Sequence, residues 1–251
     1  MLRIEHLRKA FGGVIATSDV SIHFPKDSLS AVIGPNGAGK TTFFNLISGA
    51  IRPDAGSIYL DGENIVGLSG NDIVRKGIGR AFQVAKLFKS LTVEESLRGA
   101  LLSPLGRSAQ MSGRFPLPET RDRAVEVMDQ LGLTSKAHVI SGNLSHGDQK
   151  LLDMALALVL KPKVLLLDEP VAGMGPEERE QMIETVHALW KQGGLTVVLI
   201  EHDMDIVFRI SQHIHVLSYG KLLAEGNPDE IRNNPAVIEA YLGTPREAQH
   251  A

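Results

Sequence analysis

The first third of the chain alternates short apolar stretches with turn residues. Residues 2–7 and 20–24 are typical of half-buried strands, whereas residues 29–33 are apolar throughout and predict a strand buried on both faces. A glycine-rich segment follows directly, and residues 42–48 then have a helical apolar pattern closed by Gly49. Residues 56–62 predict half of a surface hairpin. The N-terminal part therefore combines strands with one strand–loop–helix unit.

In the rest of the chain, the spacing of apolar residues changes twice. Helical patterns cover residues 93–98, 120–131 and 148–160, with an interval rich in Ser, Gly and Pro at residues 103–118. Strand and helix patterns then alternate through residues 164–168, 176–191 and 195–200. Strand–helix–strand repeats of this kind predict an α/β fold in which a mostly parallel sheet carries helices on both faces. Residues 92–160 resemble a helical insertion into that sheet.

Composition narrows the possible function classes. The 251 residues include 26 Lys and Arg against 29 Asp and Glu, with no Cys, which excludes disulfides, thiolate zinc sites and iron–sulfur clusters. A formal charge of −3 and a pI near 6.3 argue against a surface that coats nucleic acid. The longest apolar run, residues 154–160, is too short to cross a bilayer, and the charged N-terminus is unlike a signal peptide. We expect a cytoplasmic protein.

The glycine-rich segment carries the first candidate chemistry. Gly34, Gly39, Lys40 and Thr41 match the P-loop pattern, in which glycines let successive backbone N–H groups turn toward a phosphate. Lys40 would reach the β- and γ-phosphates, and the Thr41 hydroxyl would ligate Mg²⁺. The helix that follows adds the positive end of its dipole. The predicted ligand is a nucleoside triphosphate with Mg²⁺.

A second candidate lies where the strand at residues 164–168 ends. In P-loop proteins, a carboxylate at the end of a buried strand holds Mg²⁺ through its water shell, which suits Asp168. Glu169 follows, where a carboxylate can orient or deprotonate an attacking water. The alternative is an ordinary strand that ends in a solvated acidic pair. The P-loop earlier in the chain favours the chemical interpretation.

With the P-loop and the acidic strand end, the chain resembles the ATP-binding subunits of ABC transporters over nearly its whole length. Residues 144–150, Leu-Ser-His-Gly-Asp-Gln-Lys, are similar to the family's signature, with Ser145 and Gly147 matching and His146 and Asp148 departing from it. The resemblance implies a RecA-like P-loop NTPase core with an N-terminal antiparallel β subdomain and an inserted α-helical subdomain. It places the single ABC ATPase domain over residues 1–251, with the core at 1–83 and 161–251 and the insertion at 84–160.

The resemblance also assigns roles to single residues. Gln83, Glu169 and His202 take the catalytic positions, with Gln83 as the Q-loop glutamine and His202 as the H-loop histidine. Phe11 takes the place of the aromatic ring that stacks on adenine. The implied Mg²⁺ set is Thr41, Gln83 and Asp168. The implied ATP-binding set is Phe11, Gly34, Pro35, Asn36, Gly37, Ala38, Gly39, Lys40, Thr41, Thr42, Ser145 and Gly147.

Departures from the family pattern lead to further expectations. An acidic Asp148 would repel the phosphate that the signature caps, so we expect its side chain to point toward the helix start. Gly175 stands where many relatives have an Asp that pairs across the dimer, which weakens any catalytic role of this loop. His213 and His215 share a strand face without a third ligand nearby in the sequence, and we interpret them as structural.

Residues 170–174, 200–204 and 231–243 narrow the resemblance to the ATPase subunits of bacterial branched-chain amino acid importers. It implies a peripheral protein on the cytoplasmic face of the inner membrane. Its partners would be a second ATPase, as a heterodimer or homodimer, transmembrane permeases and, indirectly, a periplasmic solute-binding protein, without nucleic acid. Similar tails occur in urea or amide importers and in the lipopolysaccharide-export ATPase. A non-transport ABC ATPase and a metabolic P-loop kinase remain alternatives, although a kinase has no use for the signature.

Overall fold

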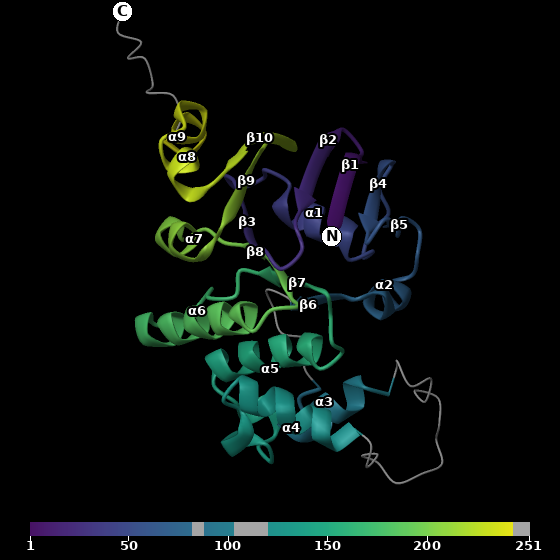
Figure 1. The fold of residues 1–251 in the computed structure, drawn as a ribbon, viewed down its shortest axis with the longest axis vertical. Helices are drawn as coiled ribbons and strands as arrows, with labels where there is room; N and C mark the ends of the chain where they lie inside the picture. Colours follow the sequence, from purple (N-terminus) through teal and green to yellow (C-terminus); the bar gives the residue numbers. More distant parts are fainter. Residues whose placement is uncertain (82–87, 103–119, 243–251) are drawn as a thin grey trace, which may run out of the picture. The chain divides into compact units, whose positions relative to one another are not determined.

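The computed structural model describes residues 1–81, 88–102 and 120–242 (Figure 1). The chain divides into two compact units. Unit 1 consists of Met1–Gly67 and Val198–Ala251, and unit 2 of Leu68–Val197. The division falls inside the buried strand β8 (Thr196–Ile200). Each unit has its own core, and the candidate functional residues are divided between them.

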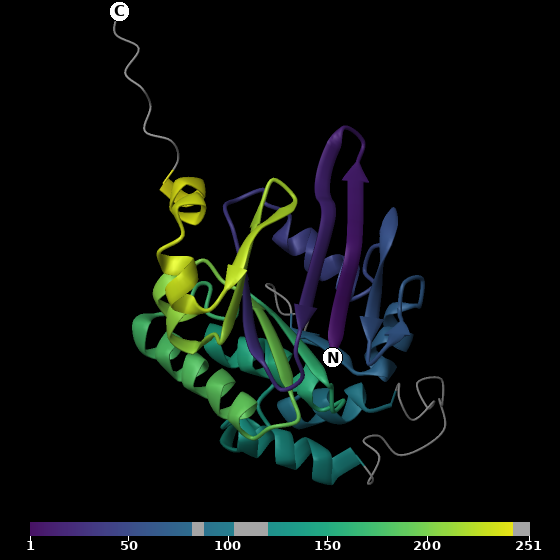
Figure 2. The same cartoon turned by 45° about the horizontal axis from the view of Figure 1, so that its top comes forward.

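Unit 1 contains an antiparallel sheet in the order β2-β1-β4-β5. Leu2 pairs with Phe24 on one neighbouring strand and with Leu60 on the other. Buried residues such as Leu2 and Ile4 alternate with exposed ones, as expected for a sheet with one covered face. Figure 2 shows β1 and β2 as two long strands that run side by side, in purple. The strands are β1 (Leu2–Phe11), β2 (Val14–Phe24), β4 (Ala55–Leu60) and β5 (Glu63–Asn64).

The other strands of unit 1 carry the glycine-rich loop. β3 (Leu29–Ile33), buried along its whole length, pairs in parallel with β9 (His213–Ser218), which pairs antiparallel with β10 (Lys221–Gly226). Phe43 of helix α1 is buried, and its ring centre lies 6.5 Å from that of Phe24. The helices of unit 1 are α1 (Lys40–Ile47), α7 (Met204–Ile210), α8 (Pro228–Arg232) and α9 (Pro235–Leu242).

Unit 2 is built around two parallel strands, β6 (Ile78–Ala81) and β7 (Val164–Asp168). Every residue of β7 is buried, which explains why this stretch is apolar up to its final Asp. Helix α5 packs against β6, β7 and α6. The helices of unit 2 are α2 (Gly70–Lys76), α3 (Val93–Ala100), α4 (Arg121–Gln130), α5 (His146–Leu158) and α6 (Pro176–Lys191).

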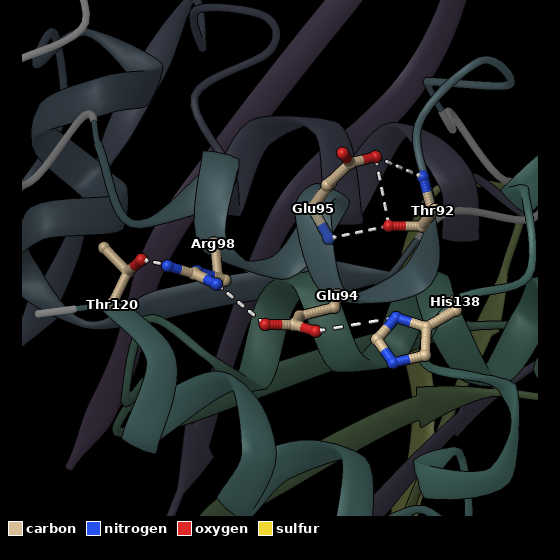
Figure 3. Close-up of polar contacts among 6 residues, drawn as sticks. All are labelled: Thr92, Glu94, Glu95, Arg98, Thr120 and His138. Atoms are coloured by element: carbon tan, nitrogen blue, oxygen red, sulfur yellow. Dashed lines mark hydrogen bonds and ion pairs between the residues drawn. The ribbon is translucent and has the colours of Figure 1, made fainter. Parts of the chain in front are cut away.

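Helices α3, α4 and α5 pack on one another, and polar contacts fix the ends of α3 (Figure 3). Thr92 and Glu95 form a capping box, with the Glu95 N–H donating to Thr92 Oγ1 and the Thr92 N–H donating to Glu95 Oε2. Further along, Arg98 bonds both Glu94 at 2.7 Å and the Thr120 hydroxyl at 3.1 Å. These bonds hold α3 to the start of α4.

The parallel strands and the alternating helices confirm the predicted α/β class. The structure differs in element boundaries, because α1 already begins at Lys40 and α5 at His146, where the sequence pattern placed helix starts later. Polar residues at helix starts carry no apolar period, so their helical state escapes a pattern search. Within the described ranges, no helix has the length and apolar character that crossing a bilayer requires. The proposed boundary of the helical insertion, 84–160, stays a prediction.

Candidate functional site

The loop between β3 and α1 has a backbone that depends on glycine. Gly34, Gly37 and Gly39 have φ angles of 151°, 79° and 99°. A Cβ at Gly34 would lie 2.1 Å from the Leu217 carbonyl oxygen, and one at Gly39 would lie 2.1 Å from the Ala16 carbonyl oxygen. These two positions therefore exclude side chains by close packing as well as by φ.

Lys40 anchors this loop from inside. Its side chain is largely buried, and Nζ donates to the carbonyl oxygens of Gly34 at 2.6 Å and Pro35 at 3.1 Å. The N-cap of α1, Gly39, has no side chain to satisfy the first N–H groups of the helix. A buried cation beside uncapped N–H groups is suited to an anion such as a phosphate. Asn36, Gly37 and Thr41 are exposed there, and Pro35 and Thr42 are half-buried, whereas Ala38 is buried.

Two further predicted residues belong to unit 1. Phe11, the last residue of β1, has 49% of its surface exposed, and Lys9 Nζ lies 5.5 Å from its ring centre. An aromatic ring in this state can stack on a base, and it is not the core residue that a Phe usually is. His202 is exposed in the turn before α7, where its N–H donates to Glu201 Oε2 at 3.0 Å. Both side chains are accessible to a ligand.

In unit 2, Asp168 ends β7 with only 4% of its surface exposed. Its Oδ2 accepts a hydrogen bond from Arg80 Nη2 at 2.8 Å, and the Arg80 side chain is itself buried. Arg80 is not among the functional residues predicted from the sequence. The available signal was a charged residue inside the otherwise uncharged stretch that became β6. Buried charges need partners, so an arginine in that position indicates a buried carboxylate nearby.

Glu169 follows with an unusual backbone. Its φ of 50° lies in the left-handed region, which costs a non-glycine residue conformational energy. Its carbonyl oxygen accepts a hydrogen bond from Nζ of the buried Lys150, on α5, at 2.8 Å. Strain of this kind is common at functional sites, where the surroundings hold one conformation.

The signature segment forms the start of α5. Ser145 is the N-cap: its hydroxyl accepts the Asp148 N–H at 3.1 Å and donates to Asp148 Oδ2 at 2.8 Å. The expected orientation of Asp148 toward the helix start is confirmed. Lys136 Nζ pairs with the other carboxylate oxygen, Oδ1, at 2.5 Å. The charge of Asp148 is thus neutralised by Lys136, a residue that does not belong to the signature. Gly147, within the signature, is buried.

The loop after Glu169 contacts the same helix start. Nε2 of His146, the first departure from the signature, lies 3.3 Å from the Ala172 carbonyl oxygen. A Cβ on Gly147 would lie 3.2 Å from Glu178 Oε1. Gly175 is the N-cap of α6, and its N–H lies 3.3 Å from Glu178 Oε2. Gly175, which stands where many relatives have an Asp, is therefore the start of a helix here.

Gln83 lies outside the described residues. Of the other two residues predicted to hold Mg²⁺, Thr41 is exposed in unit 1 and Asp168 is buried in unit 2. Among the described residues, no group of three or more His, Cys, Asp and Glu side chains can hold a metal ion. Hydroxyl and carboxylate oxygens are the kind of ligand that Mg²⁺ takes, so the chemistry of each of these two side chains suits it.

His215 is a buried histidine on strand β9 of unit 1. It packs edge-on to Phe24, with ring centres 4.9 Å apart, and its Nδ1 lies 3.1 Å from Glu225 Oε2. Burial lowers the pKa of His215 to about 4, and Glu225 opposes part of that decrease. Its surroundings are those of a neutral core histidine.

Comparison with known proteins identifies the family. A family model described as ABC transporter matches residues 17–172. The chain belongs to the ABC transporter family. A second model, described as branched-chain amino acid ATP-binding cassette transporter, matches residues 221–247 of this cassette. The cassette is 40% identical to the branched-chain amino acid transport ATP-binding proteins LivG of Salmonella typhimurium and BraF of Pseudomonas aeruginosa, over 97% of this chain and 98% of each relative.

Solved structures agree with this membership. A cassette of an ABC transporter in its ADP conformation superposes with a TM-score of 0.87 at 32% identity, covering 97% of this chain and 99% of that one. A dimeric bacterial ABC transporter cassette gives a TM-score of 0.77 at 25% identity, covering 91% and 99%. The P-loop NTPase fold predicted from the sequence is therefore confirmed, as is the assignment to ABC-type ATPases.

Proposed function

We propose that this cassette is the ATP-hydrolysing subunit of a membrane transporter that takes up branched-chain or related amino acids. The observation that carries the proposal is the similarity to LivG and BraF along nearly the whole chain, including the C-terminal segment 221–247. A match limited to the P-loop region would support only nucleotide binding. Similarity that extends through the tail supports the same kind of transporter.

In this proposal, each set of residues has one task on a single nucleotide. Lys40 and the N–H groups of α1 bind the phosphates, and Phe11 stacks on the base. Thr41 and Asp168 would hold Mg²⁺, which would supply positive charge to the phosphate oxygens. Glu169 orients or deprotonates the attacking water.

The remaining residues sense the terminal phosphate. His202 donates a hydrogen bond to it, and Gln83 links the water and the metal to the helical segment. Proximity and electrostatic complementarity supply most of the catalysis in phosphoryl transfer, so these residues act by position.

The partners follow from the same relationship. We propose a head-to-tail dimer with a second ATPase, in which Ser145 and Gly147 donate to the phosphate held by the partner subunit. Bound ATP then holds the two cassettes together, and hydrolysis releases them. The dimer works on transmembrane permeases at the cytoplasmic face of the inner membrane, with a periplasmic solute-binding protein that delivers the amino acid. A homodimer is the alternative arrangement.

The test of the chemistry compares two substitutions. Glu169→Gln should retain ATP binding and lose hydrolysis by roughly 100-fold or more, because the water loses its base. Lys40→Ala should weaken ATP binding itself, because the phosphates lose their nearest point charge. Glu177→Gln, an exposed position in the first turn of α6, is the matched control and should behave as wild type. Unchanged turnover in Glu169→Gln within the assembled complex would remove Glu169 from this role.

The transported solute needs a separate experiment. The tagged cassette should be purified from native membranes in mild detergent, and the proteins that come with it identified. Recovery of a second ATPase, permeases and a solute-binding protein that binds leucine, isoleucine or valine would support the proposal. A binding protein that prefers urea or an amide would reassign the cargo, and recovery from the soluble fraction alone would contradict the transport role.

A further inference from the structure

The carboxylate proposed to hold Mg²⁺ already has a cation beside it. Arg80 lies on β6 opposite Leu166 of β7, and Leu166 and Asp168 share one face of their strand because side chains alternate. The guanidinium can therefore reach two residues along β7, where Nη2 donates to Asp168 Oδ2 at 2.8 Å. The Arg80 and Asp168 side chains are 6% and 4% exposed.

Because both side chains are buried, the ion pair of Arg80 with Asp168 matters for the charge of the carboxylate. A carboxylate this far from water is strongly unfavourable without a counter-charge, and Arg80 supplies one whether or not a metal ion is present. Arginine keeps its proton at any physiological pH, so its charge is permanent. A metal ion arriving at Asp168 meets a carboxylate whose charge is already compensated.

We propose that Arg80 is the resident counter-ion of Asp168: it fixes the carboxylate in place and its charge weakens the binding of Mg²⁺. This inference rests on the proposed role of Asp168. Arg80 is a positioning residue, since it acts through Asp168.

The geometry distinguishes Arg80 from the other buried cation nearby. Lys150 Nζ bonds the main-chain carbonyl of Glu169, whereas Arg80 bonds the Asp168 side chain itself. A charge held against one carboxylate oxygen lowers the attraction of the whole carboxylate for a second cation. Removing the Arg80 charge should therefore change metal binding, beyond any effect on folding.

The experiment measures how Mg²⁺ promotes the binding of a non-hydrolysable ATP analogue to the full-length chain. Affinity is determined in EDTA and at increasing Mg²⁺ for wild type, Arg80→Met, Arg80→Lys and Arg75→Met. Arg75 is the matched control, because its side chain is 52% exposed on α2 and pairs with Asp72 in the same helix. Analogue affinity in EDTA should be similar in all the variants.

The expected result is a fall in the half-saturating Mg²⁺ concentration of Arg80→Met by roughly ten-fold. Arg80→Lys, which keeps the charge, should stay close to wild type, as should Arg75→Met. An unchanged Mg²⁺ dependence in folded Arg80→Met would overturn the proposal and leave the ion pair as a purely structural one.

A second variant protects the test against misfolding. If Arg80→Met does not fold, Arg80→Gln retains an N–H donor for Asp168 without the charge, and the same decrease is expected of it. No decrease in Arg80→Gln would likewise overturn the proposal. Failure of the wild-type chain to bind the analogue with or without Mg²⁺ would instead contradict the proposed function.

Discussion

Nζ of Lys150, on the signature helix α5, donates a hydrogen bond to the main-chain carbonyl of Glu169 at 2.8 Å. Glu169 has a φ of 50°, and Lys150 is buried, so the bond holds a strained backbone from inside the core. In the proposed mechanism, α5 serves the nucleotide of the partner and Glu169 serves the chain's own. In that mechanism, the bond from Lys150 links the helix that serves one ATP to the residue that serves the other.

The first prediction concerns this bond. Lys150→Met removes the donor but keeps the length of the side chain. The main-chain carbonyl of Glu169 then loses this hydrogen bond, while the phosphate-binding loop is unchanged. We expect kcat for ATP to fall by about 10- to 100-fold, because small displacements of a catalytic group cost this much, with little change in KM. Steady-state kinetics will check this. Lys191 is an exposed lysine at the end of α6, and Lys191→Met is the control. Equal losses in both variants would contradict it.

The second prediction concerns the charge at the signature. Asp148 is neutralised by Lys136. In the proposed dimer, Lys136→Met would leave the negative charge of Asp148 near the phosphate held by the partner subunit. Because the Lys136 side chain is 39% exposed, we expect only a few-fold loss of ATPase activity in the assembled complex. The double variant Lys136→Met/Asp148→Asn should recover most of it.

Rescue separates electrostatics from packing. If the double variant is no more active than Lys136→Met, the ion pair affects the signature through structure and not through charge. Asp148→Asn alone keeps an oxygen that can accept from the Ser145 hydroxyl, so this single variant should have the smallest effect.

The third prediction concerns stability against pH. The pKa of His215 is about 4 in the folded chain and 6.5 in its ordinary state, with burial as the main cause. Between these values the unfolded chain binds a proton that the folded chain does not, so stability is full above about pH 6.5 and decreases toward pH 4. His215→Phe should flatten this dependence. Urea midpoints at pH 7 and pH 5 will measure it, and equal slopes in both proteins would exclude His215 as the cause.

The fourth prediction concerns the capping box of α3. Thr92→Ala removes the hydroxyl that accepts the Glu95 N–H and should destabilise the chain by about 1 kcal/mol. Thr92→Ser retains the hydroxyl and should lose much less. Chemical unfolding of the two variants compares them directly. Similar losses would mean that the methyl group, and not the cap, stabilises this position.

Some of the site could be predicted because it is local in the chain. The P-loop works through consecutive backbone N–H groups, so its glycines and Lys40 are recognisable without tertiary structure. The orientation of Asp148 could also be predicted locally, because the start of a helix attracts a carboxylate in its first turn. Asp168 was recognisable as the acidic end of an apolar strand.

Arg80 could not be predicted in the same way. It lies 88 positions from Asp168 in the sequence, and only the pairing of β6 with β7 brings them together. The bond from Lys150 to Glu169 depends on how α5 packs near the end of β7. Lys136 reaches Asp148 from a short turn before the signature, and no motif marks it.

The fold class, the phosphate-binding loop and the acidic strand end could be predicted from the sequence alone, since each depends on periodicity or on neighbouring residues. The resemblance of the signature and tail segments indicated the family. Only the tertiary structure shows that buried Arg80 bonds the Asp168 carboxylate and that buried Lys150 bonds the main chain of Glu169. The physical reason is that a buried charge must find its counter-charge across the packed core, and the partner is chosen by strand register and helix packing, which no local pattern records.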